Sequence, residues 1–376
     1  MKIAFYVNYL NHHQVAVADE LYRLLGDDFT FVATYPHNVA ELKGGKDYSK
    51  RPYCLQTAES AEAHRKAMKL LHEVDVAVIG GGNLAYEIAR AKTGKLTFEM
   101  SERWLKQGWL NVLSPLVLKN LYYYYTLFKH KNIYKLCCGG YAASDCRKLG
   151  VYKDRCFKWG YFTGANATFC LSEFPNTDNG AATIMWCARF IDWKHPELPV
   201  MIAAQLKAEG YRIKINMYGE GKERSRIQNM VQHHGVEDEI HFMGVYANTE
   251  IIQAMRAHDI FLMTSDRREG WGAVVNEAMA NGCVPVVSDA VGCAPYLIRD
   301  GVNGLLFKSG DVDSLTNKVR WLLEHSEERR KMREAALHHI NSLWNPRHAA
   351  EALLQLSSDL LSEKEPSITE GPGSRA

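Results

Sequence analysis

The 376-residue chain lacks the sequence features that identify membrane, secreted or highly charged proteins. It has no run of about 18 uninterrupted apolar residues, which a membrane-spanning helix requires. Residues 1–7 lack the long apolar stretch of a signal peptide. Charge of one sign is not in excess, because 45 basic and 43 acidic side chains leave a net charge of +2. We therefore expect a cytoplasmic protein that does not bind nucleic acid through its overall charge.

The cysteines lack the spacing of a metal site or of a disulfide framework. There are nine of them. None belongs to a Cys-x-x-Cys pair, and only Cys137 and Cys138 are adjacent. A zinc site requires closely spaced ligand pairs, and disulfide frameworks are typical of small secreted chains. We therefore expect free, buried thiols and no metal site.

Short apolar segments alternate with amphipathic segments along nearly the whole chain. The strands expected in the first half are 2–8, 29–34, 53–58, 74–80, 95–101 and 135–142. Those expected in the second half are 183–188, 212–218, 239–243, 260–264, 284–288 and 304–307. Strands that alternate with helices predict parallel sheets, and the chain is long enough for two cores. The fold class is therefore α/β, with two Rossmann-like, doubly wound domains.

A segment rich in turn-forming residues separates the two halves. Residues 162–182 contain little periodic apolar pattern, and they predict an interdomain linker. The expected domains are therefore an N-terminal domain over 1–165 and a C-terminal domain over 166–344. Residues 362–376 carry Pro, Gly, Ser and Glu with few apolar side chains, and we expect this tail to be disordered.

The most informative segment is residues 264–282, which read TSDRREGWGAVVNEAMANG. An expected strand leads into a polar loop, then a turn that contains two glycines, then a helix. Glycines let the backbone approach a ligand, and the free N–H groups of a helix start suit a diphosphate. Glu269 in the loop and Glu277 in the helix can face one cleft, where a carboxylate accepts hydrogen bonds from the hydroxyls of a sugar.

This segment resembles the E-x-x-x-x-x-x-x-E signature of the family 4 retaining glycosyltransferases. Residues 285–288, Gly292 and residues 300–306 follow in the order and spacing of that family. The resemblance implies the GT-B architecture, in which two Rossmann-like domains face a cleft. It implies transfer of a sugar from a nucleoside-diphosphate sugar to a hydroxyl of a glycan or lipid-linked acceptor, in cell-surface polysaccharide synthesis. No metal or other cofactor is expected.

The resemblance extends to two cations that follow the expected strand at 183–188. Arg189 and Lys194 correspond to the residues that hold the donor diphosphate in relatives, and such cations neutralise a leaving phosphate without a metal. The resemblance also implies that Glu277 binds the ribose and Glu269 the donor sugar. The other donor-binding residues that it implies are Gly219, Gly221, Phe242, Met243, Gly244, Gly270, Trp271 and Gly272.

The N-terminal half departs from the family pattern in two places. The first loop contains Asn11, His12 and His13 where many relatives have a glycine pair. These side chains serve the acceptor or the donor phosphate, or else Asn11 caps the next helix and the histidines are exposed. No histidine follows the fifth expected strand, and Glu102 or Arg103 takes that place, with Glu102 as the catalytic candidate. A last helix over about 345–361 is expected to cross back to the first domain, as in the resembled fold.

Two other enzymes remain as alternatives. Residues 80–85 fit Gly-x-Gly-x-x-Ala after a strand, and Glu99 follows about 20 residues later, as in an NAD-dependent oxidoreductase. The motif follows the fourth strand rather than the first, however, and no catalytic histidine–acid pair is visible. A glycine loop beside the acceptor is the alternative interpretation of residues 80–85. A nucleotide-sugar epimerase of the same architecture is the second alternative.

Residues 103–144 contain no acidic side chain but several basic and many aromatic or aliphatic ones. The basic residues are Arg103, Lys106, Lys119, Lys129, Lys131 and Lys135. This composition is typical of an interfacial helix, and it predicts contact of residues 103–135 with an anionic membrane at its inner face. The alternative is a buried helical pair whose lysines point to water. No nucleic-acid-binding motif accompanies the patch, so nucleic acid is not an expected partner.

Overall fold

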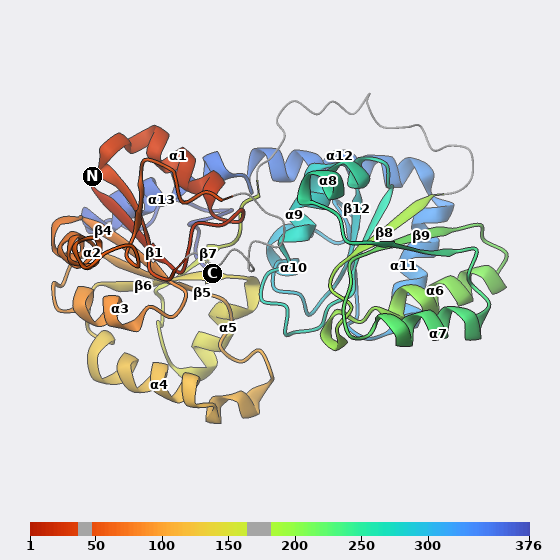
Figure 1. The fold of residues 1–376 in the computed structure, drawn as a ribbon, viewed down its shortest axis with the longest axis horizontal. Helices are drawn as coiled ribbons and strands as arrows, with labels where there is room; N and C mark the ends of the chain where they lie inside the picture. Colours follow the sequence, from red (N-terminus) through yellow and green to blue (C-terminus); the bar gives the residue numbers. More distant parts are fainter. Residues whose placement is uncertain (37–46, 164–181) are drawn as a thin grey trace. The chain divides into compact units, whose positions relative to one another are not determined.

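The computed structural model of the protein describes residues 1–36, 47–163 and 182–376. The predicted domain boundary at 165/166 and nearly all of the predicted linker lie outside these residues. The chain divides into two compact units, shown in Figure 1. Unit 1 consists of Met1–Gly164 with Leu343–Ala376, and unit 2 of Ala165–Ser342. Among the described helices, none has the length and apolar character needed to cross a membrane.

Unit 1 contains a parallel sheet of seven strands in the order β3-β2-β1-β4-β5-β6-β7. The strands are β1 (Ile3–Val7), β2 (Phe29–Ala33), β3 (Cys54–Gln56), β4 (Val76–Gly80), β5 (Thr97–Ser101), β6 (Ile133–Cys138) and β7 (Cys156–Trp159). Every residue of β1 and of β4 is buried, which explains why both strands are continuous apolar runs. The strand order reverses between β1 and β4, and ligands of such sheets bind at the carboxyl ends of the strands at that point.

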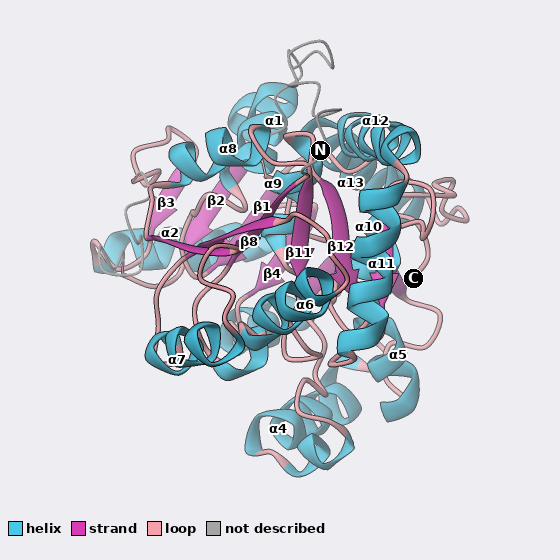
Figure 2. Ribbon diagram, turned by 90° about the vertical axis from the view of Figure 1, so that its right-hand side faces the viewer, coloured by secondary structure: helices cyan, strands magenta, loops and turns pink. Residues whose placement is uncertain are grey.

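Helices cover the sheet of unit 1, and side-chain caps explain where several of them begin. The helical elements are α1 (Val15–Leu25), η1 (Gly26–Asp28), α2 (Ala61–Glu73), α3 (Leu84–Ala91), η3 (Trp109–Leu113), α4 (Pro115–Tyr123), η4 (Tyr124–Phe128), α5 (Gly140–Leu149) and α13 (Pro346–Leu361). Ser60, Ser114 and Asn345 accept hydrogen bonds from backbone N–H groups at the starts of α2, α4 and α13. From the far end of the chain, α13 returns to pack against α1. Figure 2 shows α4 standing away from the strands of this unit.

Unit 2 contains a parallel sheet of six strands in the order β10-β9-β8-β11-β12-β13. The strands are β8 (Thr183–Cys187), β9 (Lys214–Tyr218), β10 (Ile240–Gly244), β11 (Ile260–Met263), β12 (Val284–Ser288) and β13 (Leu305–Phe307). The helices are α6 (Glu197–Ala208), α7 (Arg224–His234), α8 (Asn248–Arg256), α9 (Ala273–Ala280), α10 (Ala294–Leu297), α11 (Val312–Glu324) and α12 (Ser326–Ser342). Helices α6, α7 and α11 cover one face of the sheet, and α8, α9 and α12 cover the other (Figure 1).

The fold class predicted from the sequence is confirmed, since both sheets are parallel and lie between helices. Each expected strand has a counterpart whose bounds differ by a few residues. The largest difference is β6, which ends at Cys138 because α5 begins at Gly140. Only β7 was not predicted, because this edge strand has four residues and shows no clear alternation.

The prediction of a disordered tail over 362–376 is wrong. The tail runs antiparallel to β7, where the Lys158 N–H donates to the Ser374 carbonyl at 2.8 Å and the Ala376 N–H donates to the Cys156 carbonyl at 3.0 Å. Residues 371–374 are buried. An edge strand leaves backbone groups unpaired, and the tail satisfies them without apolar side chains. Composition alone therefore does not reveal this element.

Candidate functional site

The strand order of unit 2 reverses between β8 and β11, and the loops that follow these strands lie side by side. The Asp266 N–H donates to the Trp193 carbonyl at 2.9 Å, and the Thr264 hydroxyl donates to the Lys194 carbonyl at 2.6 Å. The indole N–H of Trp186 on β8 donates to the Thr264 hydroxyl oxygen at 2.8 Å. These bonds hold the two loops together at the carboxyl edge of the sheet.

The two loops bring Lys194 and Glu269 into a direct ion pair. Their side chains are only 14% and 17% exposed. Arg189, from the first of these loops, is exposed and lies over the Trp193 ring, with its guanidinium carbon 5.7 Å from the ring centroid. It forms no ion pair with any described residue, so its charge is available to a ligand. The predicted diphosphate-binding and sugar-binding residues thus share one edge of unit 2.

Glu277 lies in α9 and is buried, at 8% exposure. It accepts a hydrogen bond from the Asn248 side-chain amide at 3.1 Å, and burial raises its pKa to about 7. Burial also raises the pKa of the Cys187 thiol to about 12, and the charges of Glu277 and Lys194 act on that thiol in opposite directions. Cys187 is the last residue of β8, so both charges act at the carboxyl end of this strand.

Replacement of Glu277 by glutamine is expected to stabilise unit 2 at neutral pH. Between the ordinary carboxyl pKa of 4.5 and about 7, the folded protein keeps a proton that the unfolded chain releases. Stability is therefore lost as the pH rises through this window, by roughly 3 kcal/mol in all. The melting temperature of Glu277→Gln should exceed that of the wild type by several degrees at pH 7.5, but not at pH 4. Glu237→Gln, at an exposed position of unit 2, is the control. An equal gain at both pH values would contradict the argument.

The glycine turn after β9 packs against the loop after β8. A Cβ atom on Gly219 would lie 2.1 Å from the Ala188 carbonyl oxygen, and one on Gly221 would lie 2.4 Å from that of Phe190. Both glycines have positive φ angles, of 123° and 157°. Neither position therefore admits a side chain, and the backbone of this turn lies close to Ala188 and Phe190, the two neighbours of Arg189 in the chain.

The segment predicted to contact the base is the end of β10. Its residues are Phe242, Met243 and Gly244, all partly exposed. The guanidinium carbon of Arg224 lies 3.6 Å from the centroid of the Phe242 ring. The Gly219 N–H donates to the Gly244 carbonyl at 2.7 Å, which joins this segment to the glycine turn.

The start of α9 follows Gly270, Trp271 and Gly272. Gly272 has a φ of 96°, which favours glycine, and it directly precedes the helix. Trp271 is only 1% exposed, and its indole N–H donates to the Asn276 side-chain oxygen at 2.9 Å. The indole therefore supports α9 from within unit 2, and its side chain is not open to a ligand.

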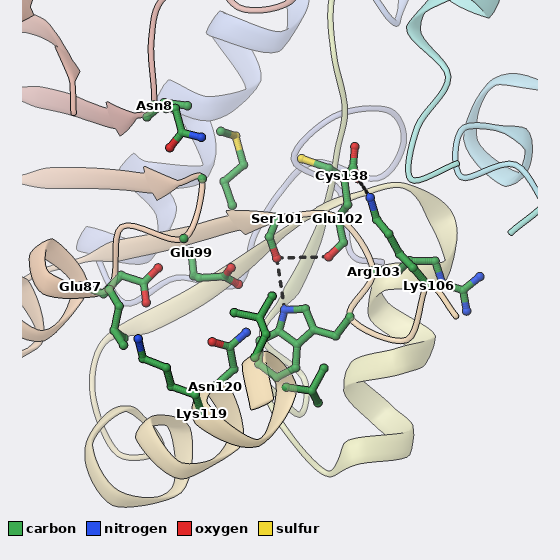
Figure 3. A pocket seen from close by; sticks show the side chains of 18 of the residues that line it. Asn8, Glu87, Glu99, Ser101, Glu102, Arg103, Lys106, Lys119, Asn120 and Cys138 are labelled. Atoms are coloured by element: carbon green, nitrogen blue, oxygen red, sulfur yellow. Dashed lines mark hydrogen bonds and ion pairs between the residues drawn. The ribbon is translucent and has the colours of Figure 1, made fainter. Parts of the chain in front are cut away.

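Unit 1 contains a pocket of about 750 Å³ at the carboxyl ends of its strands, shown in Figure 3. Most of the residues that line it lie at or just after the carboxyl ends of β1, β4, β5 and β6, or belong to α3 and α4. Its polar lining includes Asn8, Asn11, Gln14, Glu87, Glu99, Ser101, Glu102, Lys106, Lys119 and Asn120. The pocket thus lies where the strand order reverses in this unit.

The three residues predicted as a binding site in the loop after β1 lie in different surroundings. Asn11 lines the pocket, and its side-chain oxygen accepts the His13 N–H at 2.9 Å rather than a bond from within α1. His12 is exposed, while the His13 ring stacks on Tyr161 with the centroids 5.4 Å apart. Burial, and secondarily the charge of His12, lower the pKa of His13 to about 3. At neutral pH, His13 is therefore uncharged and supplies no cation for a phosphate.

The structure separates the two candidates that follow β5. Glu102 lines the pocket, where it pairs with Lys106 and accepts a hydrogen bond from the Tyr161 hydroxyl at 3.1 Å. Arg103 also lines the pocket, but its guanidinium group forms a buried two-bond contact with Asp145, at 3.0 and 3.2 Å. Arg103 is thus neutralised by a side chain 42 residues away, and it is not a free catalytic or membrane-binding cation.

Two acidic residues of the pocket were not predicted as site residues. Glu87 projects from α3. Glu99 on β5 forms an ion pair with the fully buried Lys135, which also donates to the Ser101 hydroxyl oxygen at 2.6 Å. Glu99 and Lys135 occupy matching positions on the neighbouring strands β5 and β6. A glutamate and a lysine inside two otherwise apolar strands were therefore the sequence signal from which this buried pair could have been predicted. Because Lys135 engages Glu99, this carboxylate is not the free ribose-binding acid that an oxidoreductase requires, and Lys135 is not a surface cation.

The cysteines in the described part of the chain are free thiols. There are eight of them, of which Cys54 and Cys187 are partly exposed and the other six are buried. No group of three or more histidine, cysteine, aspartate or glutamate side chains among the described residues is arranged to hold a metal ion.

Comparison with known proteins links unit 2 to an enzyme family. Residues 171–339 match the family model described as Glycosyl transferases group 1. The N-acetyl-alpha-D-glucosaminyl L-malate synthase of Bacillus anthracis is 34% identical over 123 residues, which is 33% of this chain and 31% of that protein. The lipopolysaccharide core biosynthesis glycosyltransferase LpsE of Rhizobium meliloti is 26% identical over 196 residues, or 52% and 55% of the two chains. The chain thus spans about a third to about half of the length of these curated relatives.

Solved structures match the chain over the length of both units. HepE of Anabaena, in complex with UDP, matches with a TM-score of 0.71 and 16% identity, over 96% of this chain and 100% of that chain. The lipopolysaccharide outer core galactosyltransferase WaaB, in its apo form, matches with a TM-score of 0.67 and 15% identity, over 96% and 99%. At such identities the likeness shows the fold, which is the GT-B architecture. The family match and the named relatives identify a glycosyltransferase domain in this chain.

Proposed function

We propose that the protein is a retaining glycosyltransferase that moves a sugar from a nucleoside-diphosphate sugar to a hydroxyl of a glycan or lipid-linked acceptor. The observation that carries this proposal is the set of Arg189, Lys194 and Glu269 at the strand-order reversal of unit 2, inside the segment that matches the family. Relatives with roles in lipopolysaccharide synthesis support an acceptor in cell-surface polysaccharide synthesis.

The donor is expected to replace the ion pair between Lys194 and Glu269, which joins the two loops of unit 2 in the structure. The diphosphate binds Arg189, Lys194 and the backbone N–H groups at the start of α9, since each favours negative charge. Glu269, relieved of its pairing with Lys194, accepts hydrogen bonds from the donor sugar, and Glu277 accepts those of the ribose. The base lies against the end of β10, whose residue Phe242 is already stacked under Arg224.

The transfer breaks the bond between the anomeric carbon and the leaving phosphate oxygen, and it forms a bond to the acceptor oxygen on the same face. The proton of the acceptor hydroxyl passes to the leaving phosphate, so no glutamate nucleophile is needed. Negative charge develops on the diphosphate, and fixed cations stabilise it most where water is excluded. Arg189 and Lys194 supply that charge at one edge of unit 2.

A screen of nucleotide sugars by thermal shift tests the proposal, and UDP-sugars are the first donors to examine because HepE was crystallised with UDP. A donor at about a hundred times its Kd should stabilise the protein by roughly 2.7 kcal/mol. The same donor should release its nucleotide when an acceptor is added. Stabilisation without nucleotide release under any acceptor would identify a binding protein rather than a transferase.

Activity is expected to survive an excess of EDTA. In this proposal Arg189 and Lys194 take the place of a divalent cation beside the diphosphate, so removing metal should leave the rate within about twofold of its value before chelation. The measurement is nucleotide release from the donor identified above, with and without EDTA. A complete loss that manganese restores would show that a metal holds the diphosphate.

A nucleotide-sugar epimerase is the second candidate, because it can share this two-domain architecture. Incubation with donor and no acceptor separates the two enzymes. A transferase leaves the sugar configuration of the donor unchanged, whereas an epimerase converts it, and chromatography of the recovered donor distinguishes them.

We also propose that unit 1 contacts an anionic membrane through residues 103–135, at the inner face. Large apolar side chains of this segment are exposed, and we call them the apolar patch: Trp109, Leu110, Leu113, Leu116, Leu118, Tyr122 and Tyr125. Lys119 and Lys129 are exposed among them, and the segment from 103 to 144 contains no acidic residue. Apolar side chains with interspersed lysines match the interface of an anionic bilayer.

A further inference from the structure

Several hydrogen-bond acceptors on the lining of the unit 1 pocket have no donor partner among the described residues. The side-chain oxygens of Asn8 and Gln14, both on its lining, are buried and have no hydrogen-bond partner among the described residues. The carboxyl group of Glu87 likewise forms no ion pair or hydrogen bond with any described residue. Buried polar atoms without partners are costly, and a ligand that carries several donors removes that cost.

The cations around the pocket are nearly all engaged by carboxylates. Lys135 is paired with Glu99, and Lys106 with Glu102. Lys119 is the lining cation without an acidic partner among the described residues, and Figure 3 shows it on the same side of the pocket as Glu87. An anion bound near Lys119 would therefore also lie near Glu87.

Glu87 and Glu99 extend into the pocket next to each other (Figure 3). Burial, and then the charge of Glu99, raise the pKa of Glu87 to about 8. The Glu87 carboxyl group is therefore mostly protonated at neutral pH, and it can both donate to a hydroxyl and accept from one. An anion would instead lose its water beside the Glu99 charge, and Lys135, the cation next to that charge, is already paired with Glu99.

We propose that this pocket binds an uncharged, hydroxyl-rich group such as a sugar ring, and that Glu87 is the residue that discriminates against anionic groups. The proposal rests on the proposed function, in which unit 1 receives the acceptor, and it names the chemical class of that acceptor. Leu116 both lines the pocket and belongs to the apolar patch, so an alkyl chain attached to the sugar has an apolar surface at the pocket rim.

The test compares two amphiphiles that share a tail and differ in the head group. n-Octyl glucoside carries hydroxyls without charge, and n-octyl phosphate carries a negative charge. Each is titrated into the full chain below its micelle concentration, without nucleotide sugar, by ligand-observed NMR and by thermal shift. The glucoside should bind at least about tenfold more tightly than the phosphate. Equal binding, or tighter binding of the phosphate, would overturn the proposal.

Two variants assign the discrimination to Glu87. Glu87→Lys should reverse the order of the two probes, because it places a cation beside the Lys119 side of the pocket. Glu87→Gln should keep glucoside binding within about threefold of the wild type, since an amide also donates and accepts. At pH 9, above the pKa of about 8 of the Glu87 carboxyl group, the wild type carries a charge that the amide lacks, so the variant should narrow the gap to the phosphate there. Glu62→Lys carries the same charge change at an exposed position of α2 outside the pocket, and it should leave the order unchanged.

If Glu87→Lys does not fold by circular dichroism, Glu87→Gln decides the question by the narrowed gap alone. An unchanged preference in every folded Glu87 variant would overturn the assignment. None of these measurements uses a nucleotide sugar, so their failure leaves the transferase proposal standing. Conversely, a donor screen without any hit removes the transferase and leaves the probe affinities intact.

Discussion

Replacing Arg189 by alanine is expected to lower the turnover of the donor by about a hundredfold or more, which is the usual effect of removing one group that stabilises developing charge. The side chain is exposed and supports no buried contact except its approach to the Trp193 ring, so the melting temperature should change little. Nucleotide release under single-turnover conditions is the measurement. Lys214→Ala removes an exposed cation at the opposite end of β9, and it should keep the wild-type rate.

Lys194→Ala should reduce turnover by a similar factor but with a different effect on folding. It leaves the mostly buried Glu269 without its partner, and breaking such a pair from one side destabilises a protein by roughly 3–5 kcal/mol when burial is complete. Lys194→Met combined with Glu269→Gln removes both charges, and it should restore much of the melting temperature while activity stays low. Wild-type turnover in Arg189→Ala or Lys194→Ala would remove that residue from the mechanism.

The parts of the fold that the sequence predicts are those in which local pattern and burial agree. In unit 2, β8, β11 and β12 are apolar runs flanked by polar loops, so the alternation alone marks them. The neighbouring positions of the loops after β8 and β11 then follow from the strand order. The fold brings Lys194 and Glu269, 75 residues apart, into contact, and their role in donor binding stays a prediction.

The features that the sequence does not predict depend on partners distant in the chain. Arg103 resembles a free cation until the fold places Asp145 beside it. Lys135 resembles a membrane-binding lysine, yet it is fully buried against Glu99 and over the Trp104 ring, with its amine 4.7 Å from the centroid. A charged side chain can be buried where the fold supplies a partner of opposite charge. The composition of a segment contains no information on such a partner elsewhere in the chain.

Dependence on distant partners also explains why neither the ordered tail nor the position of Glu87 in the pocket was predicted from the sequence. The segment 371–374 has no apolar side chain long enough to suggest packing, and it is ordered by backbone bonds to the edge strand β7. Glu87 appears on an amphipathic helix, where a glutamate normally faces water. Its position in a pocket follows only after α3, α4 and β5 are brought together.

Replacing Lys119, Lys129 and Lys131 together by glutamine is expected to weaken binding to anionic vesicles by about a hundredfold. Each lysine near an anionic surface contributes about 1 kcal/mol, so three of them contribute roughly 3 kcal/mol. Lys119 and Lys129 are exposed and Lys131 is half-buried, and none of the three forms an ion pair with a described residue. Folding should therefore hardly change.

Co-sedimentation with liposomes at low salt measures the effect, because salt screens the attraction. Lys214, Lys308 and Lys331 are exposed lysines of unit 2, and their replacement by glutamine gives a control with the same change of net charge. Leu110→Ser with Leu113→Ser removes apolar side chains that are 80% and 69% exposed, and it should weaken binding to anionic and neutral vesicles alike. If the wild-type protein does not bind anionic vesicles, the membrane proposal is wrong. If the control triple variant loses as much vesicle binding as the Lys119, Lys129 and Lys131 variant, the binding depends on net charge rather than on this segment. The transferase proposal would survive either result, because it rests on Arg189, Lys194 and Glu269 in unit 2.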